Sequence, residues 1–146
     1  MAKTYRVGTV TRAINALFRT LTRLGLGAGY RYILGVRGRK TGQLRETPVD
    51  VMKIDRRRFL VAGYGVSSWV YNVRAAGEVR IKRGRRCDWG LRARELPPEE
   101  SVPVLRKYYE EIRVTRPYFD VTLDSSDEEF ARETDNHPVF ELLPAR

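Results

Sequence analysis

A short segment from Gly38 to Pro48, GRKTGQLRETP, concentrates the residue types that bind anions. It places the cations Arg39, Lys40 and Arg45 within seven residues, among glycines. Arg and Lys side chains pair with phosphate and carboxylate oxygens, and glycine lets backbone N–H groups approach such a ligand closely. The segment therefore predicts a cradle for an anion, although an exposed, Arg-rich hairpin turn would have a similar composition.

Other common site chemistries find little support in the residue types. The chain has one cysteine, Cys87, and one histidine, His137, so neither a disulfide framework nor a Cys/His metal cluster is expected. It also lacks the GxxxxGK[ST] and GxGxxG nucleotide fingerprints. We interpret Cys87 as an ordinary strand residue and His137 as structural. The cysteine usage favours a reducing, cytoplasmic location.

The positive charge is confined to one part of the chain. The net charge is +10, yet residues 1–45 hold ten Lys or Arg and no Asp or Glu. The remaining 101 residues carry 18 charges of each sign and are balanced. An anionic ligand, a membrane surface or a nucleic acid is therefore expected near the N-terminal third.

Residues 10–24 predict a cationic amphipathic helix. Apolar residues recur there at helical spacing, and Arg12, Arg19 and Arg23 fall on the opposite side. The helix and its Gly-rich connection would occupy residues 1–28. Two interpretations stay open, a helix docked on the domain core and a helix resting on anionic lipid at the inner membrane face. No stretch is long and apolar enough to span a bilayer.

After residue 28 the hydrophobic period becomes that of strands. In the second of these, Val49 and Val51 alternate with polar residues that include Asp50. Strands are expected at 30–36, 45–54, 59–65, 78–82, 87–96 and 137–144, and further helices at 67–77, 97–113 and 125–133. Because hairpins join most strands, we expect a single, mainly β domain over residues 1–146, with an antiparallel sheet closed into a small barrel and flanked by helices.

Two segments together resemble the deazaflavin-dependent nitroreductase family. They are RGRKTGQLRETPV (37–49) and RFLVAGYGVSSWVYNVRAAGEVRI (58–81). Members of that family typically show a GRK[TS]GxxRxxP element, then a Gly-rich loop and a W[YV]xNL element before a short helix. The resemblance covers residues 30–95 well. It implies a split β-barrel related to the flavin reductase and pyridoxamine-phosphate oxidase folds.

The resemblance also implies a cofactor, reduced coenzyme F-420. This 8-hydroxy-5-deazaflavin carries a phosphodiester and a γ-linked oligoglutamate tail, so it is a polyanion that Arg39, Lys40 and Arg45 would bind. The other positions that the resemblance assigns to the cofactor are Thr41, Tyr64, Gly65, Ser67, Trp69 and Asn72. Of these, Trp69 is equally well explained as a core anchor beneath the short helix.

The implied reaction is hydride transfer to a lipophilic, electrophilic acceptor: a quinone, an activated alkene or a nitro compound. Tyr118, in RPYFD, is the candidate for gating or protonation, whereas Tyr108 and Tyr109 are expected to pack a helix. The loop from Tyr64 to Ser68 lacks the Lys and the Pro common in the family. This departure indicates a divergent branch, so substrate preferences are not transferred.

Three alternatives remain. An FMN-binding split-barrel protein shares the expected fold, but the extra cations of the cradle count against it. A basic β-barrel that binds nucleic acid is disfavoured, because the aromatic residues near the motifs lie in mixed apolar context rather than on an alternating exposed face. A peripheral membrane protein would act through residues 10–24. By analogy with other split barrels, a homodimer is expected.

Overall fold

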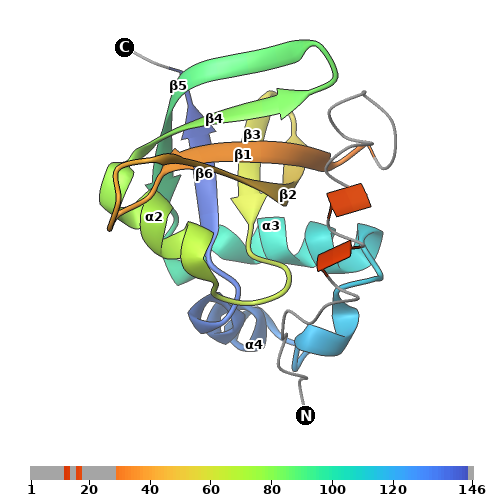
Figure 1. The fold of residues 1–146 in the computed structure, drawn as a ribbon. Coiled ribbons are helices and arrows are strands. Elements are labelled where there is room, and N and C mark those ends of the chain that lie inside the picture. The colour runs from red at the N-terminus through yellow and green to blue at the C-terminus, as the bar shows by residue number, and fades with distance from the viewer. Residues whose placement is uncertain (1–11, 14–15, 18–28, 145–146) are drawn as a thin grey trace.

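Six strands form a closed, antiparallel barrel in the computed structural model, which describes residues 12–13, 16–17 and 29–144 (Figure 1). Around the barrel the order is β1-β2-β3-β6-β5-β4, and pairing of β1 with β4 closes it. The predicted mainly β barrel is confirmed. The strands are β1 (Arg31–Arg37), β2 (Leu44–Ile54), β3 (Arg57–Val61), β4 (Glu78–Arg83), β5 (Arg86–Glu95) and β6 (Val139–Leu143).

Helices flank the barrel on separate sides. In Figure 1, α2 lies beside the ends of β1 and β2, whereas α3 runs beneath the barrel with α4 below it. Gly77, with φ 70°, ends α2 in the left-handed conformation that glycine adopts easily, close to the expected end of the helix at residue 77. The helices are α2 (Ser68–Ala76), α3 (Pro98–Glu111) and α4 (Asp127–Arg132), with 3-10 turns η1 (Arg116–Tyr118) and η2 (Glu133–Asp135).

Two hydrophobic clusters hold these layers together. One fills the barrel and includes Val49 and Val51 of β2, and Val70 and Val73 of α2 pack against it. The other lies between the sheet and α3 and takes Met52 from the opposite face of β2. Successive side chains of a strand point to opposite faces, so β2 contributes to both clusters. The site described below therefore rests on a strand that is packed on both sides.

The predicted boundaries need one correction. The third strand was expected to run from 59 to 65, but β3 ends at Val61. Ala62 and Gly65 close a turn in which the Gly65 N–H donates to the Ala62 carbonyl at 3.1 Å, and Gly65 has φ 104°. The apolar residues of FLVAGYG conceal this turn from a periodicity argument.

The predicted helix at 10–24 lies mostly outside the described residues. Its four described residues, at 12–13 and 16–17, are helical and exposed. Among the described residues, no helix is long and apolar enough to cross a membrane.

Candidate functional site

A cavity of about 580 Å³ lies where the β1–β2 hairpin, the loop after β3 and the start of α2 meet. Segments far apart in sequence thus contribute to one hollow. That the predicted residues bind the cofactor remains a prediction, but the barrel brings all of these residues together at this cavity. The lining includes every residue assigned to the cofactor from the sequence: Arg39, Lys40, Thr41, Arg45, Tyr64, Gly65, Ser67, Trp69 and Asn72.

The cationic side of the cavity is built on the turn between β1 and β2. The Gly38 N–H donates to the Gln43 carbonyl, and the Gly42 N–H donates to the Gly38 carbonyl, both at 2.8 Å. Gly42 has φ 72°, which a residue with a side chain rarely adopts. The glycines of GRKTGQ therefore shape the turn that carries Lys40 at its tip.

Arg39 ties this turn to α2. Its backbone N–H and its Nη1 both donate to the Asn72 Oδ1, at 3.0 and 2.8 Å, and its guanidinium lies 5.2 Å from the centre of the Tyr71 ring. Asn72 is itself buried. Two residues assigned to the cofactor thus bind each other, and their contact fixes the turn against the helix.

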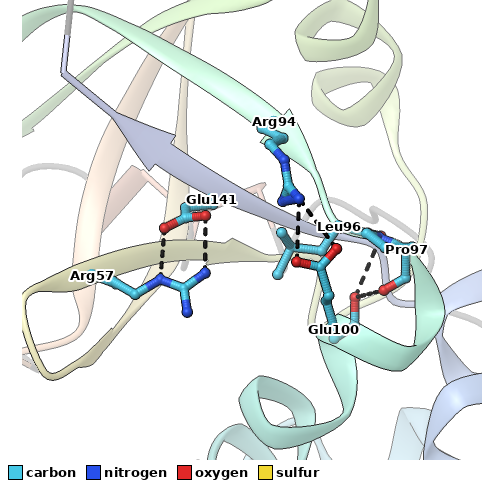
Figure 2. Close-up of polar contacts among 7 residues, drawn as sticks. Arg57, Arg94, Leu96, Pro97, Glu100 and Glu141 are labelled. Atoms are coloured by element: carbon cyan, nitrogen blue, oxygen red, sulfur yellow. Dashed lines mark hydrogen bonds and ion pairs between the residues drawn. The ribbon is translucent and has the colours of Figure 1, made fainter.

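Lys40 and Arg45 are exposed and, within residues 29–144, form no ion pair. Several other cations do form ion pairs, as Figure 2 shows for Arg57 with Glu141 and for Arg94 with Glu100. Hydrogen bonds from Arg57 hold the pKa of Glu141 below its ordinary value. The following also pair: Arg58 with Asp88, Arg74 with Glu95, Arg80 and Lys82 with Glu46, and Arg106 with Asp127.

Another part of the cavity wall is aromatic and apolar. Trp69 lines it and also packs on the barrel core, with its ring centre 6.2 Å from that of Phe140. The two interpretations of Trp69 are therefore compatible. Val36, Val49 and Val61 complete an apolar surface at which an aromatic ring system would be desolvated.

Asp50 is a residue of the site that the sequence analysis missed. It was expected among the polar positions of the second strand, but it is 4% exposed and lines the cavity. The Arg31 Nε donates to its Oδ1 at 3.0 Å, and the Tyr108 hydroxyl donates to its Oδ2 at 2.6 Å. Burial raises the pKa of Asp50 above its ordinary value, against the opposing effects of Arg31 and Tyr108. The sequence signal that could have indicated this role is a single acidic residue between the apolar residues of a strand.

Tyr118, the predicted gating or protonating residue, lies one ring away from the cavity. It is half-buried in η1, and its ring meets that of Tyr64 edge-on, with the centres 5.3 Å apart. Buried His137 has its Nδ1 and Nε2 each 2.8 Å from a backbone carbonyl oxygen, those of Ala62 and Tyr118. His137 therefore connects η1 to the loop that lines the cavity, in agreement with a structural role.

Comparisons with known proteins agree with this arrangement. A family model described as F420H2-dependent quinone reductase matches residues 10–128. A solved structure described as a domain-swapped dimer is 20% identical, with a TM-score of 0.55, and covers 91% of this chain and 96% of its own. An F420-H2 dependent reductase, FDR-A, is 21% identical, with a TM-score of 0.52 and coverage of 78% and 94%.

A third solved structure, of a FAD-binding protein from Mesorhizobium loti, is 16% identical. Its TM-score is 0.51, and the match covers 90% of each chain. At these identities the structural matches establish the fold alone. No curated protein matches the sequence.

The fold is thus that of the split-barrel proteins, a class whose members include flavin binders. Within it, the chain belongs to the F420H2-dependent quinone reductase family, whose model matches most of its length. It is accordingly a coenzyme F-420-dependent reductase. The predicted family resemblance and cofactor are both confirmed at this level.

The residues present fit that coenzyme. Lys40 and Arg45 offer positive charge that no ion pair of residues 29–144 neutralises, as a phosphodiester and a carboxylate tail require. Trp69 and the valines offer an apolar wall for a planar ring system. The coenzyme has an anionic tail and an aromatic ring system, which match the cationic side and the apolar wall of the cavity.

Proposed function

We propose that the protein transfers hydride from reduced coenzyme F-420 to a lipophilic, quinone-like acceptor, with activated alkenes and nitro compounds as the nearest chemical variants. The observation that carries the proposal is the pair of cations, Lys40 and Arg45, which have no acidic partner within residues 29–144 and line a cavity with a partly apolar wall. Charge of this kind, beside an apolar surface, favours a ligand that combines a polyanionic tail with a ring.

Each predicted residue then has a task. Lys40 and Arg45 hold the phosphodiester and the tail carboxylates, and Thr41 adds a hydroxyl beside them. Arg39 and Asn72 fix the turn against α2 and so keep the cations in place. The ring system is held by the remaining predicted residues: Tyr64, Gly65, Ser67 and Trp69.

The chain's contribution to the reaction is binding, orientation and exclusion of water. Reduced coenzyme F-420, when bound, supplies the hydride. The apolar wall desolvates the acceptor and holds it close, which removes much of the entropic cost of bringing two reactants together. Tyr118 acts as a gating residue through Tyr64, because the two rings are in contact and Tyr64 lines the cavity.

A steady-state assay with reduced coenzyme F-420 tests the acceptor class. We expect a naphthoquinone to be reduced with a higher kcat/KM than an enone or a nitroimidazole, since the wall is apolar and accommodates a planar ring. Oxidation of the coenzyme is followed by its absorbance. If none of the three accelerates that oxidation over the protein-free rate, the proposed reaction is wrong.

The wider assembly is also a proposal. The similar protein described as a domain-swapped dimer supports a homodimer here. Contact of residues 10–24 with a membrane would bring a lipophilic acceptor to the cavity. FMN is the alternative ligand, favoured only by the shared fold of the FAD-binding neighbour.

A further inference from the structure

Reduction of a quinone-like acceptor requires a proton as well as a hydride. The hydride delivers two electrons, so the acceptor oxygen is left with a negative charge until it is protonated. Among the described residues that line the cavity, Asp50 is the one with a carboxyl group. We propose that the Asp50 carboxyl donates this proton, an inference that rests on the proposed hydride transfer.

The position of Asp50 is fixed from two sides. Arg31 faces it across the β1–β2 pair, and Tyr108 reaches it from α3. Each contact occupies one lone pair of a different carboxylate oxygen, which leaves a second lone pair on each oxygen for a proton. Arg31 and Tyr108 therefore act as positioning residues, and Asp50 keeps the capacity to hold a proton in the cavity wall.

A close approach of the backbone makes this arrangement possible. A Cβ on Gly63 would collide with the Tyr108 hydroxyl, so a glycine at this position lets the hydroxyl reach Asp50. Tyr108 is fully buried and does not line the cavity. Tyr108 therefore supports Asp50 from the side of α3, and Asp50 itself lines the cavity.

Arg31 and Tyr108, the titratable groups in contact with Asp50, keep their protons while Asp50 titrates. Burial raises the pKa of Tyr108 well above its ordinary value, so Tyr108 remains a donor. Burial lowers the pKa of Arg31, whereas the Asp50 carboxylate and nearby tyrosines raise it. The second effect is the larger, so the pKa of Arg31 lies above its ordinary value. Tyr30 and Tyr64 are further titratable groups that act on Arg31, and Tyr64 comes from the loop after β3.

The proton that Asp50 gives to the acceptor is replaced by one from water. The Oδ–H bond of Asp50 breaks, and a new O–H bond forms on the acceptor oxygen, whose conjugate acid is a phenol with an ordinary pKa of about 10. An ordinary carboxylic acid is a far stronger acid than such a phenol, and this difference favours the transfer. The carboxylate that remains is paired with Arg31, and it takes up a proton from solvent after the product leaves.

Kinetics of Asp50→Asn give the first test. General acid catalysis contributes about 10²–10⁴-fold, so we expect kcat to fall at least about 100-fold, with the Kd for coenzyme F-420 unchanged. In the wild type, kcat/KM should fall as pH rises through the pKa of Asp50, and the variant should lose this dependence. Asp88→Asn is the matched control, because Asp88 pairs with Arg58 and does not line the cavity.

A titration of the carboxyl itself needs neither turnover nor coenzyme. We expect the ¹³C shift of the Asp50 carboxyl in the protein without coenzyme to titrate with a midpoint above the ordinary value of about 3.9. Tyr108→Phe should raise the midpoint further, because it removes a hydrogen bond to the charged form. A midpoint at or below the ordinary value would overturn the proposal, even if Asp50→Asn did not fold.

The kinetic outcomes separate this inference from the proposed function. Wild-type kcat and pH dependence in Asp50→Asn would show that Asp50 is not the donor. Loss of coenzyme binding by a folded Asp50→Asn would show that it is a binding residue instead. If the wild type itself bound no coenzyme F-420, the proposed function would fail, whatever the carboxyl titration gave.

Discussion

Reversing two charges at the cavity, Lys40→Glu with Arg45→Glu, is expected to weaken binding of coenzyme F-420 by at least about 100-fold. Each side chain is exposed and has no acidic partner within residues 29–144, so it is available to the ligand's phosphodiester and carboxylates. Charge-assisted hydrogen bonds contribute about 1.5–3 kcal/mol each, and about 3 kcal/mol corresponds to a 100-fold change in Kd. The Kd is measured by coenzyme fluorescence.

The matched control is Arg85→Glu with Arg113→Glu. It changes the net charge by the same amount at two exposed positions that do not line the cavity. We expect its Kd to stay within a few-fold of the wild type, and both double variants to keep the wild-type Tm within a few degrees. Equal losses of affinity in the two variants would mean that overall charge, and not the cradle, attracts the coenzyme. Arg39 is left unchanged because it also fixes the turn to Asn72.

The second large effect is on stability. Gly63→Ala is expected to destabilise the fold by about 3 kcal/mol, because overpacking a core typically costs 1–3 kcal/mol and this site has little room to relax. The new methyl group would collide with the Tyr108 hydroxyl, which the buried Asp50 holds in place. Thermal unfolding followed by circular dichroism should show a Tm lower by roughly 10 °C.

A double variant tests the cause. Tyr108→Phe removes the hydroxyl that the methyl group meets, so Gly63→Ala should cost less in that background than in the wild type. Relief should be partial, since the ring carbon that carries the hydroxyl and Thr115 also lie close to the added Cβ. Strictly additive losses would contradict a clash between these two groups and point to a backbone requirement at Gly63.

The sequence predicts the barrel because its local signals agree. Alternating apolar residues such as Val49 and Val51 mark strands. The glycines of GRKTGQ mark a turn, and this turn requires the positive φ of 72° at Gly42. The grouping of Arg39, Lys40 and Arg45 at one cavity was predictable for the same reason, since all three lie in one short segment. β3 was predicted four residues too long because the turn after Val61 is built from small and apolar residues.

Asp50 could not be predicted, because its environment is made by distant residues. Arg31 is 19 positions away and reaches it through the register of two strands, and Tyr108 is 58 positions away on a helix packed beneath the sheet. Strand alternation suggested an outward-facing polar residue, whereas that face of β2 is covered by α3. The two-residue alternation along a strand shows which side chains share a face of the sheet, but it does not show which element covers that face.

The most direct test of the account is a fluorescence titration of the purified protein with oxidised coenzyme F-420 and, separately, with FMN. We expect saturable binding of coenzyme F-420 and binding of FMN at least about 10-fold weaker, since FMN has a phosphate but no oligoglutamate tail for the cradle to hold. Tighter binding of FMN, or no binding of either ligand, would contradict the assignment of the cavity to the deazaflavin coenzyme.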